Sequence, residues 1–105
     1  MRLKNGVRIA GVRPEMVLAL SIVESILGDH GVDCVVVTSL VDGQHSRGSL
    51  HYVGCACDIR SRDMPQTHYD EIFEELKKAL GEDFDLVDEG DHWHCEFQPK
   101  TGVNT

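Results

Sequence analysis

The chain has 105 residues, too few for two units that each bury a core, so the sequence predicts one domain over residues 1–105. Its formal net charge is −8, and its ten Lys and Arg residues are scattered along the chain. Nucleic-acid binding needs clustered basic residues, so the composition argues against that class. No apolar run approaches the roughly 20 residues that cross a bilayer, and the first residues lack the apolar core of a signal peptide. We therefore expect cytoplasmic synthesis and no membrane segment.

The first predicted element is a helix over residues 13–27. It follows a basic, glycine-punctuated stretch, residues 1–13, which we expect to be extended. Pro14 suits the first turn of a helix, and Glu15 lies near the positive end of its dipole. The sequence Gly-Asp-His-Gly at 28–31 is a typical helix end. The broad apolar face of this helix predicts that it is mostly buried.

The rest of the chain predicts four strands and a second helix. The helix is expected over Thr67–Leu80, where apolar residues recur at helical spacing opposite charged ones. Strands are expected where β-branched or alternating apolar residues occur, at 33–38, 55–60, 83–88 and 92–97. The last two would form a hairpin, and residues 99–105 a polar tail. This order predicts an α+β fold in which helices pack against a largely antiparallel sheet.

The four cysteines form no C-x-x-C pair. Without a secretion signal we expect them to be reduced, and to pack in strand-like stretches as small buried hydrophobes. A zinc site built from Cys55, Cys57 and Cys95 is the alternative. Side chains alternate along a strand, so Cys55 and Cys57 would face away from Asp58, which disfavours that alternative.

Two stretches carry the candidate chemistry. Residues 49–58 read S-x-H-x-x-G-x-A-x-D, with His51 and Asp58 as possible ligands, and residues 89–94 read E-x-x-H-x-H. Histidine nitrogens and a carboxylate oxygen are the ligands of hydrolytic zinc sites, in which three protein ligands leave a fourth position for water. The small Gly54 would let the intervening loop bend back. Together the two stretches predict a zinc peptidase.

The second stretch leaves two choices open. His92 and His94 are two residues apart on a predicted strand, so both would point to one face, where one can bind metal and the other stays free. Peptide hydrolysis also needs a carboxylate that accepts a proton from water and passes it to the leaving amine. Glu89 at the hairpin turn and Asp91 are the two candidates.

These motifs resemble those of the zinc D-Ala-D-Ala carboxypeptidase and L-Ala-D-Glu endopeptidase family, whose fold is shared with the hedgehog signalling domain. The similarity extends from about Val32 to Phe97 and is densest in His45-Ser-Arg-Gly-Ser-Leu-His-Tyr and Glu89-Gly-Asp-His-Trp-His. Short members of this kind resemble phage and prophage proteins. The resemblance implies that His51, Asp58 and His94 are the zinc ligands. It assigns His92 to stabilising the oxyanion of the tetrahedral intermediate.

The same resemblance assigns supporting roles near the ligands. Glu89 would be the general acid and base, although some members place that acid where this chain has Asp91. On the substrate-binding side, Ser49 matches the motif serine as a support behind the ligands. Arg47 is a candidate to pair with a substrate carboxylate, because its guanidinium offers a bidentate fork.

We therefore expect a monomeric zinc peptidase that cuts peptidoglycan stem peptides, as a phage endolysin or tail-associated hydrolase does. It would act at the cell wall after release by phage lysis or from a virion. The resemblance leaves open whether D-Ala-D-Ala, L-Ala-D-Glu or a cross-bridge is cut. An inactive binding module that keeps its zinc is the main alternative, and a structural zinc protein that uses cysteines is the third.

Overall fold

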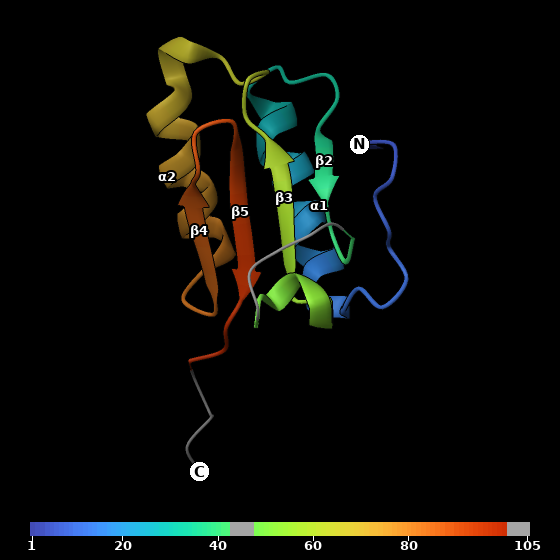
Figure 1. Ribbon diagram of the computed structural model, residues 1–105. Coiled ribbons are helices and arrows are strands. Elements are labelled where there is room, and N and C mark those ends of the chain that lie inside the picture. The colour runs from blue at the N-terminus through green and yellow to red at the C-terminus, as the bar shows by residue number, and fades with distance from the viewer. Residues whose placement is uncertain (43–47, 101–105) are drawn as a thin grey trace.

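A computed structural model of the protein describes residues 1–42 and 48–100. Two helices pack on one face of a five-stranded sheet whose strand order is β1-β2-β3-β5-β4, and they lie behind the sheet in the view of Figure 1. The elements in chain order are β1 (Arg2–Leu3), α1 (Pro14–Asp29), β2 (Val36–Ser39), the 3-10 turn η1 (Leu50–Val53), β3 (Ala56–Arg60), the 3-10 turn η2 (Gln66–His68), α2 (Tyr69–Leu80), β4 (Phe84–Asp88) and β5 (His92–Phe97). The predicted α+β class is confirmed.

The sheet is mixed, with one parallel pair at its edge. β2 pairs with β3, β3 with β5 and β5 with β4 in antiparallel fashion, as expected for a largely antiparallel sheet. β1 runs parallel to β2, with Arg2 opposite Val36. Residues 1–13 were expected to be a simple extended stretch, and this pairing was not foreseen because two residues carry no recognisable strand pattern. The amino-terminal segment is thus part of the sheet (Figure 1).

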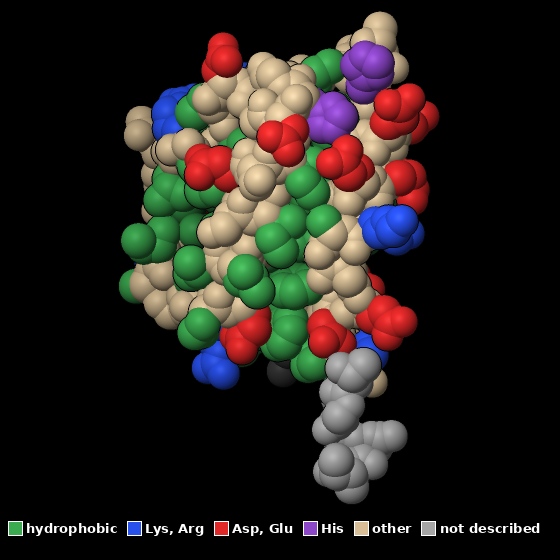
Figure 2. Space-filling view, turned by 180° about the vertical axis from the view of Figure 1, so that it is seen from behind, with side chains coloured by type: hydrophobic (Ala, Val, Ile, Leu, Met, Phe, Trp, Pro, Cys, Tyr) green, Lys and Arg blue, Asp and Glu red, His purple; other side chains and the backbone are tan. Residues whose placement is uncertain are grey.

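Both predicted helices are present, with ends that differ by about two residues from expectation. Pro14 occupies the first turn of α1, and Gly31, with φ of 86°, follows its carboxyl end. The buried stripe of α1 consists of Met16, Ala19, Leu20, Val23, Ile26 and Leu27. Its outer side leaves Val17 and Leu18 exposed, and hydrophobic side chains are visible across this face in Figure 2. α1 is therefore less completely covered than its apolar sequence predicted.

Alternation along β3 and β5 divides the sheet into two faces. On β3, Cys57 and Ile59 are fully buried against the helices, whereas Asp58 between them lies on the opposite face. On β5, Trp93 and Cys95 enter the same core. We call the face without helices the open face; it carries all the candidate site residues that lie on strands.

Trp93 anchors β5 between the two candidate histidines of the second motif. Its ring is fully buried and makes edge-to-face contacts with Tyr69 and Phe73 of α2, at centroid distances of 5.3 and 5.1 Å. The indole Nε1 donates a hydrogen bond of 2.8 Å to the Tyr69 hydroxyl, which donates to Asp88 at 2.9 Å. Packing on the helical side therefore fixes the strand whose other side carries the site.

The cysteines divide into two pairs. Cys57 and Cys95 are buried, directly opposite each other in the β3–β5 ladder, as expected for small hydrophobes. The same expectation is wrong for Cys34, which lies before β2 and is exposed, and only partly met by Cys55, which precedes β3. All four are free thiols.

Among the described helices, none combines the length and apolar character that crossing a bilayer requires.

Candidate metal centre

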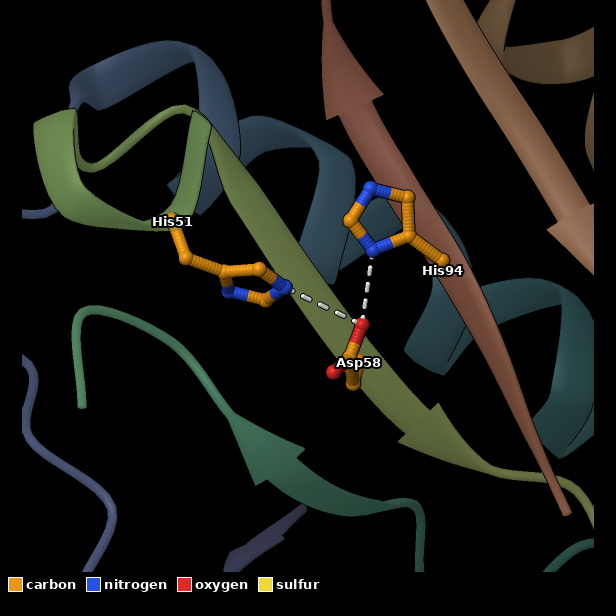
Figure 3. Close-up of side chains that lie close together, drawn as sticks. All are labelled: His51, Asp58 and His94. Carbon is orange, nitrogen blue, oxygen red and sulfur yellow. Dashed lines mark hydrogen bonds and ion pairs between the residues drawn. The ribbon is translucent and has the colours of Figure 1, made fainter. Parts of the chain in front are cut away.

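His51, Asp58 and His94 converge on the open face (Figure 3). The two imidazole rings approach the Asp58 carboxylate from different elements, η1 and β5. His51 Nε2 lies 3.2 Å and His94 Nδ1 2.8 Å from Asp58 Oδ1. One donor atom from each residue lies within 4.8 Å of the others. The sequence predicted this trio, and the structure brings it together.

The backbone around Gly54 places His51. The Ser49 hydroxyl accepts a hydrogen bond from the His51 amide at 3.2 Å and caps η1, which supports the assigned role of Ser49 behind the ligands. Gly54 then ends the turn with a positive φ of 76°. A Cβ at this position would overlap the carbonyl oxygen of Gly11, so a larger residue cannot fit without a backbone shift. The predicted bend at Gly54 is confirmed, and it leaves His51 only 1% exposed.

Strand register places the other two donors. Asp58 and His94 are direct partners in the antiparallel β3–β5 ladder, and cross-strand partners point to the same face. The neighbouring pair in the same ladder, Cys57 and Cys95, is buried on the helical side and holds the two strands in the register that brings the Asp58 and His94 side chains together. The adjacency of these two ligands therefore follows from sheet register rather than from loop conformation.

Each histidine is held through its second ring nitrogen. His51 Nδ1 donates to the carbonyl oxygen of Leu40 at 2.6 Å, and His94 Nε2 lies 2.7 Å from Glu96 Oε1. Metal-binding histidines usually have such an outer partner, which fixes the ring and leaves the other nitrogen free for the ion. Glu96 was not predicted, although its position two residues after His94 on a strand places it on the same face. The Leu40 contact has no sequence signal.

The charges at the centre reinforce one another. Burial of the Asp58 carboxylate opposes its ionisation, but hydrogen bonds with His51 and His94 outweigh burial and hold its pKa well below the usual range. The hydrogen bond to Asp58 raises the pKa of His94 to about 9, against the opposing effect of burial and with further help from Glu96. At neutral pH the metal-free His94 ring thus carries a proton, and its positive charge lies beside the Asp58 carboxylate.

The donor set could hold a metal ion, since its three donor atoms all lie within 4.8 Å of one another. A tetrahedral ion about 2.0 Å from each donor separates the donors by about 3.3 Å. The observed separations of 3.2 and 2.8 Å from Asp58 to the two rings lie close to that value. The cysteine alternative finds no support, because Cys57 and Cys95 face the helical core. Among the described residues, His51, Asp58 and His94 are the group able to hold a metal ion.

His92 lies beside the trio and is held by Asp91. Its Nδ1 is 2.6 Å from Asp91 Oδ1, and its Nε2 is 3.8 Å from Asp58 Oδ2. The hydrogen bond with His92 lowers the pKa of Asp91. Both His92 and His94 therefore reach the same face, as their spacing predicted, and Asp91 is engaged in orienting His92.

Glu89, the other candidate acid, lies at a pocket beside the centre. It lines a pocket of about 430 Å³ together with His51, Asp58, His92 and His94. Its backbone amide donates to the His92 carbonyl at 2.9 Å within the β4–β5 hairpin, and its side chain is exposed. Of the two candidate acids, Glu89 is thus the one that shares a pocket with both imidazole ligands.

Two residues of the first motif lie outside the described residues: His45, and Arg47, the candidate to pair with a substrate carboxylate.

The comparisons with known proteins identify no family for this chain. No protein-family model matches the chain, and a search of curated proteins found no match. The fold and the three converging donors are established, and the resemblance to zinc peptidases stays a prediction.

Proposed function

We propose that the protein is a zinc-dependent peptidase that hydrolyses peptide bonds in peptidoglycan stem peptides. The observation that carries this proposal is the convergence of His51, Asp58 and His94 on the open face. Their outer partners support it further, because both rings are already held in a ligating orientation. The resemblance of the two sequence motifs to zinc D-Ala-D-Ala carboxypeptidases and L-Ala-D-Glu endopeptidases supplies the substrate class.

A zinc ion held by the trio would polarise the scissile carbonyl and lower the pKa of a water molecule. The chain's own residues supply the proton transfers. Glu89 accepts a proton from the attacking water and passes it to the amine nitrogen as the peptide bond breaks. Its place at the hairpin turn, in the pocket with His92 and His94, supports this role.

His92 is proposed to stabilise negative charge on the substrate. Asp91 holds its Nδ1 at 2.6 Å, which directs Nε2 toward the centre. With both ring nitrogens protonated, His92 donates Nδ1–H to Asp91 and presents Nε2–H to the substrate, where it can donate to the carbonyl oxygen as that oxygen gains charge, at little reorganisation cost. Asp91 therefore acts as a positioning residue, and Glu89 as the acid and base.

The test is digestion of purified peptidoglycan with the zinc-loaded protein, followed by mass spectrometry of the muropeptides and assay of new amine termini. We expect cleavage, its loss with chelator, and a fall of about 10²-fold or more in Glu89→Gln with zinc content unchanged. Glu74→Gln, on the exposed side of α2, is the matched control and should remain active.

Two results would change the proposal. If Asp91→Asn removed activity and Glu89→Gln did not, Asp91 would be the acid. If the wild type bound zinc and never cleaved a muropeptide, the chain would be a binding module that retains the metal without turnover.

A further inference from the structure

The tip of the β4–β5 hairpin, residues 88–91, carries groups of the proposed chemistry but none of the three candidate metal ligands. It contains Glu89 and Asp91, and His92 follows it as the first residue of β5. Asp88, Glu89 and Asp91 are exposed, so burial does not fix their positions. Inside the hairpin, the Glu89 amide donates to the His92 carbonyl at 2.9 Å, which sets the turn but not its place beside the centre. Contacts with other parts of the chain have to set that place.

Ser61 connects the tip to the strand that carries Asp58. It directly follows β3, and only 2% of its surface is exposed. Its amide donates to the Asp91 carbonyl at 3.3 Å, and its hydroxyl donates to the Gly90 carbonyl at 3.2 Å. A buried hydroxyl is costly unless it is paired, and this one is paired with the turn rather than with its own strand. The end of β3 and the hairpin tip lie at the same end of the sheet (Figure 1).

Tyr69 connects the tip to the first turn of α2. Its hydroxyl donates to Asp88 Oδ2 at 2.9 Å and accepts the indole N–H of Trp93 at 2.8 Å. The other carboxylate oxygen of Asp88 accepts the Gly90 amide at 2.9 Å, so Asp88 joins Tyr69 to the turn. A phenylalanine ring could keep the edge contact with Trp93 but could make neither hydrogen bond of the hydroxyl.

The three candidate ligands are placed by other contacts. His51 depends on η1 and on the turn at Gly54, and Asp58 and His94 depend on their pairing in the β3–β5 ladder. A catalytic acid must come within about 2.6–3.2 Å of the proton it transfers, and a misplacement of about 1 Å can lower a rate about 100-fold. Binding of the metal and placement of the acid are thus controlled by different parts of the chain.

We propose that Ser61 and Tyr69 are positioning residues that hold the hairpin tip, and with it Glu89 and His92, beside the metal centre. The inference rests on the proposed function, in which Glu89 is the acid and base and His92 stabilises the oxyanion. Ser61 and Tyr69 act through the tip rather than on the substrate. Loss of their hydroxyls lets the tip move relative to the centre, so the chemical step slows while the metal stays bound.

The test removes the two hydroxyls and first measures the tip without requiring activity. Ser61→Ala, Tyr69→Phe and the double variant are compared with the wild type, all loaded with zinc. Hydrogen exchange followed by NMR should show the Glu89 and Gly90 amides exchanging about ten-fold faster or more in the double variant, with the β3–β5 ladder unchanged. Competition with a chromogenic chelator should show a zinc dissociation constant within about two-fold of the wild type.

The second measurement is turnover of a muropeptide. We expect kcat to fall about ten-fold in each single variant and about 100-fold in the double variant, with KM little changed. Asp88→Asn should keep most of the activity, because its amide group can accept from the Gly90 amide and donate to the Tyr69 hydroxyl. Asp88→Ala should lose activity as Tyr69→Phe does.

Two control variants test whether a general loss of stability has the same effect. Ile72→Val shortens a fully buried side chain of α2 and lowers stability without touching the tip contacts. Ser21→Ala removes a hydroxyl that donates to the Val17 carbonyl at 3.2 Å on α1. Both variants should keep the wild-type kcat and the wild-type exchange of the tip amides.

Three results would overturn the inference: tip amides that exchange as in the wild type in the double variant, a kcat that survives although they exchange faster, or a kcat that falls only together with zinc content. If the wild type bound zinc and cleaved nothing, the peptidase proposal would fail. Faster exchange at the tip of the double variant would then still show that Ser61 and Tyr69 hold the tip, and unchanged exchange would refute that as well.

Discussion

The two faces of β3 and β5 differ completely in chemistry although they are made of alternate residues of the same strands. Toward the helices, Trp93 and Cys95 are fully buried in an apolar core. Toward the open face, the intervening His94 carries a ring held between Asp58 and Glu96. The core supplies stability, and the open face concentrates charge that costs stability unless each group has a partner. The comparison predicts that changes on the two faces separate folding from function.

Trp93→Ala should have the largest effect on folding. Removing a fully buried indole that contacts Tyr69 and Phe73 leaves a cavity, and such changes cost about 3–5 kcal/mol of unfolding free energy. Urea denaturation of the metal-free protein measures the loss. His92→Ala, next to it on the other face, should change stability by less than about 1 kcal/mol. A Trp93→Ala protein as stable as the wild type would contradict the division between the faces.

Gly54→Ala should lower both the stability of the fold and the affinity for zinc. Gly54 ends the turn that carries His51 and lies in close contact with the amino-terminal segment. The added Cβ would meet the Gly11 carbonyl at a position where φ is already 76°, so the backbone must shift. We expect a loss of about 2–4 kcal/mol in unfolding free energy and weaker zinc binding, measured by denaturation and by competition with a chromogenic chelator.

Gly90→Ala is the control for Gly54→Ala. Gly90 also has a positive φ, of 99°, but a Cβ there meets nothing within 4 Å. Only the conformational cost of about 1 kcal/mol should appear, with zinc affinity unchanged. Equal effects of the two substitutions would show that the close approach to Gly11 is unimportant.

The smallest predicted effect is a pH dependence confined to the open face. The folded pKa of His94, about 9, exceeds the value of about 6.5 expected when unfolded. Its contribution to metal-free stability is therefore fully present below pH 6.5 and is lost as pH rises toward 9. We expect a decline of about 1 kcal/mol, discounted because the ring is partly exposed. Denaturation with chelator from pH 6 to 9.5 measures it.

His94→Gln is the control for this pH dependence, and its unfolding free energy should change little between pH 6 and 9.5.

The proton on His94 must leave when a cation binds, so zinc binding at pH 7 should release about one proton from His94. Calorimetry in buffers of different ionisation enthalpy detects that release. Zinc binding without proton release would contradict the raised pKa.

Local patterns predicted the helices and most of the strands, and the resemblance of the two motifs predicted the trio at the centre. Helical periodicity located α1 and α2, and strand alternation placed His92 and His94 on one face. What escaped prediction depends on contacts between distant segments. β1 is defined only by its pairing with β2, and the Leu40 carbonyl meets His51 across a turn that no residue pattern encodes. Glu96 could have been found, because strand alternation applies to it as it does to His94.

The contact between Gly11 and Gly54 gives the first thirteen residues a role that their sequence does not suggest. The Arg13 amide donates to the Gly54 carbonyl at 3.0 Å, so this stretch braces the turn from which His51 projects. Nearer the start of the chain, Arg2 and Lys4 line a cavity that also includes Asp58 and His92. Trimming that stretch, or fusing a bulky partner to it, would thus disturb the candidate ligand His51 and the neighbouring cavity together while the helices and the Trp93 core stayed in place.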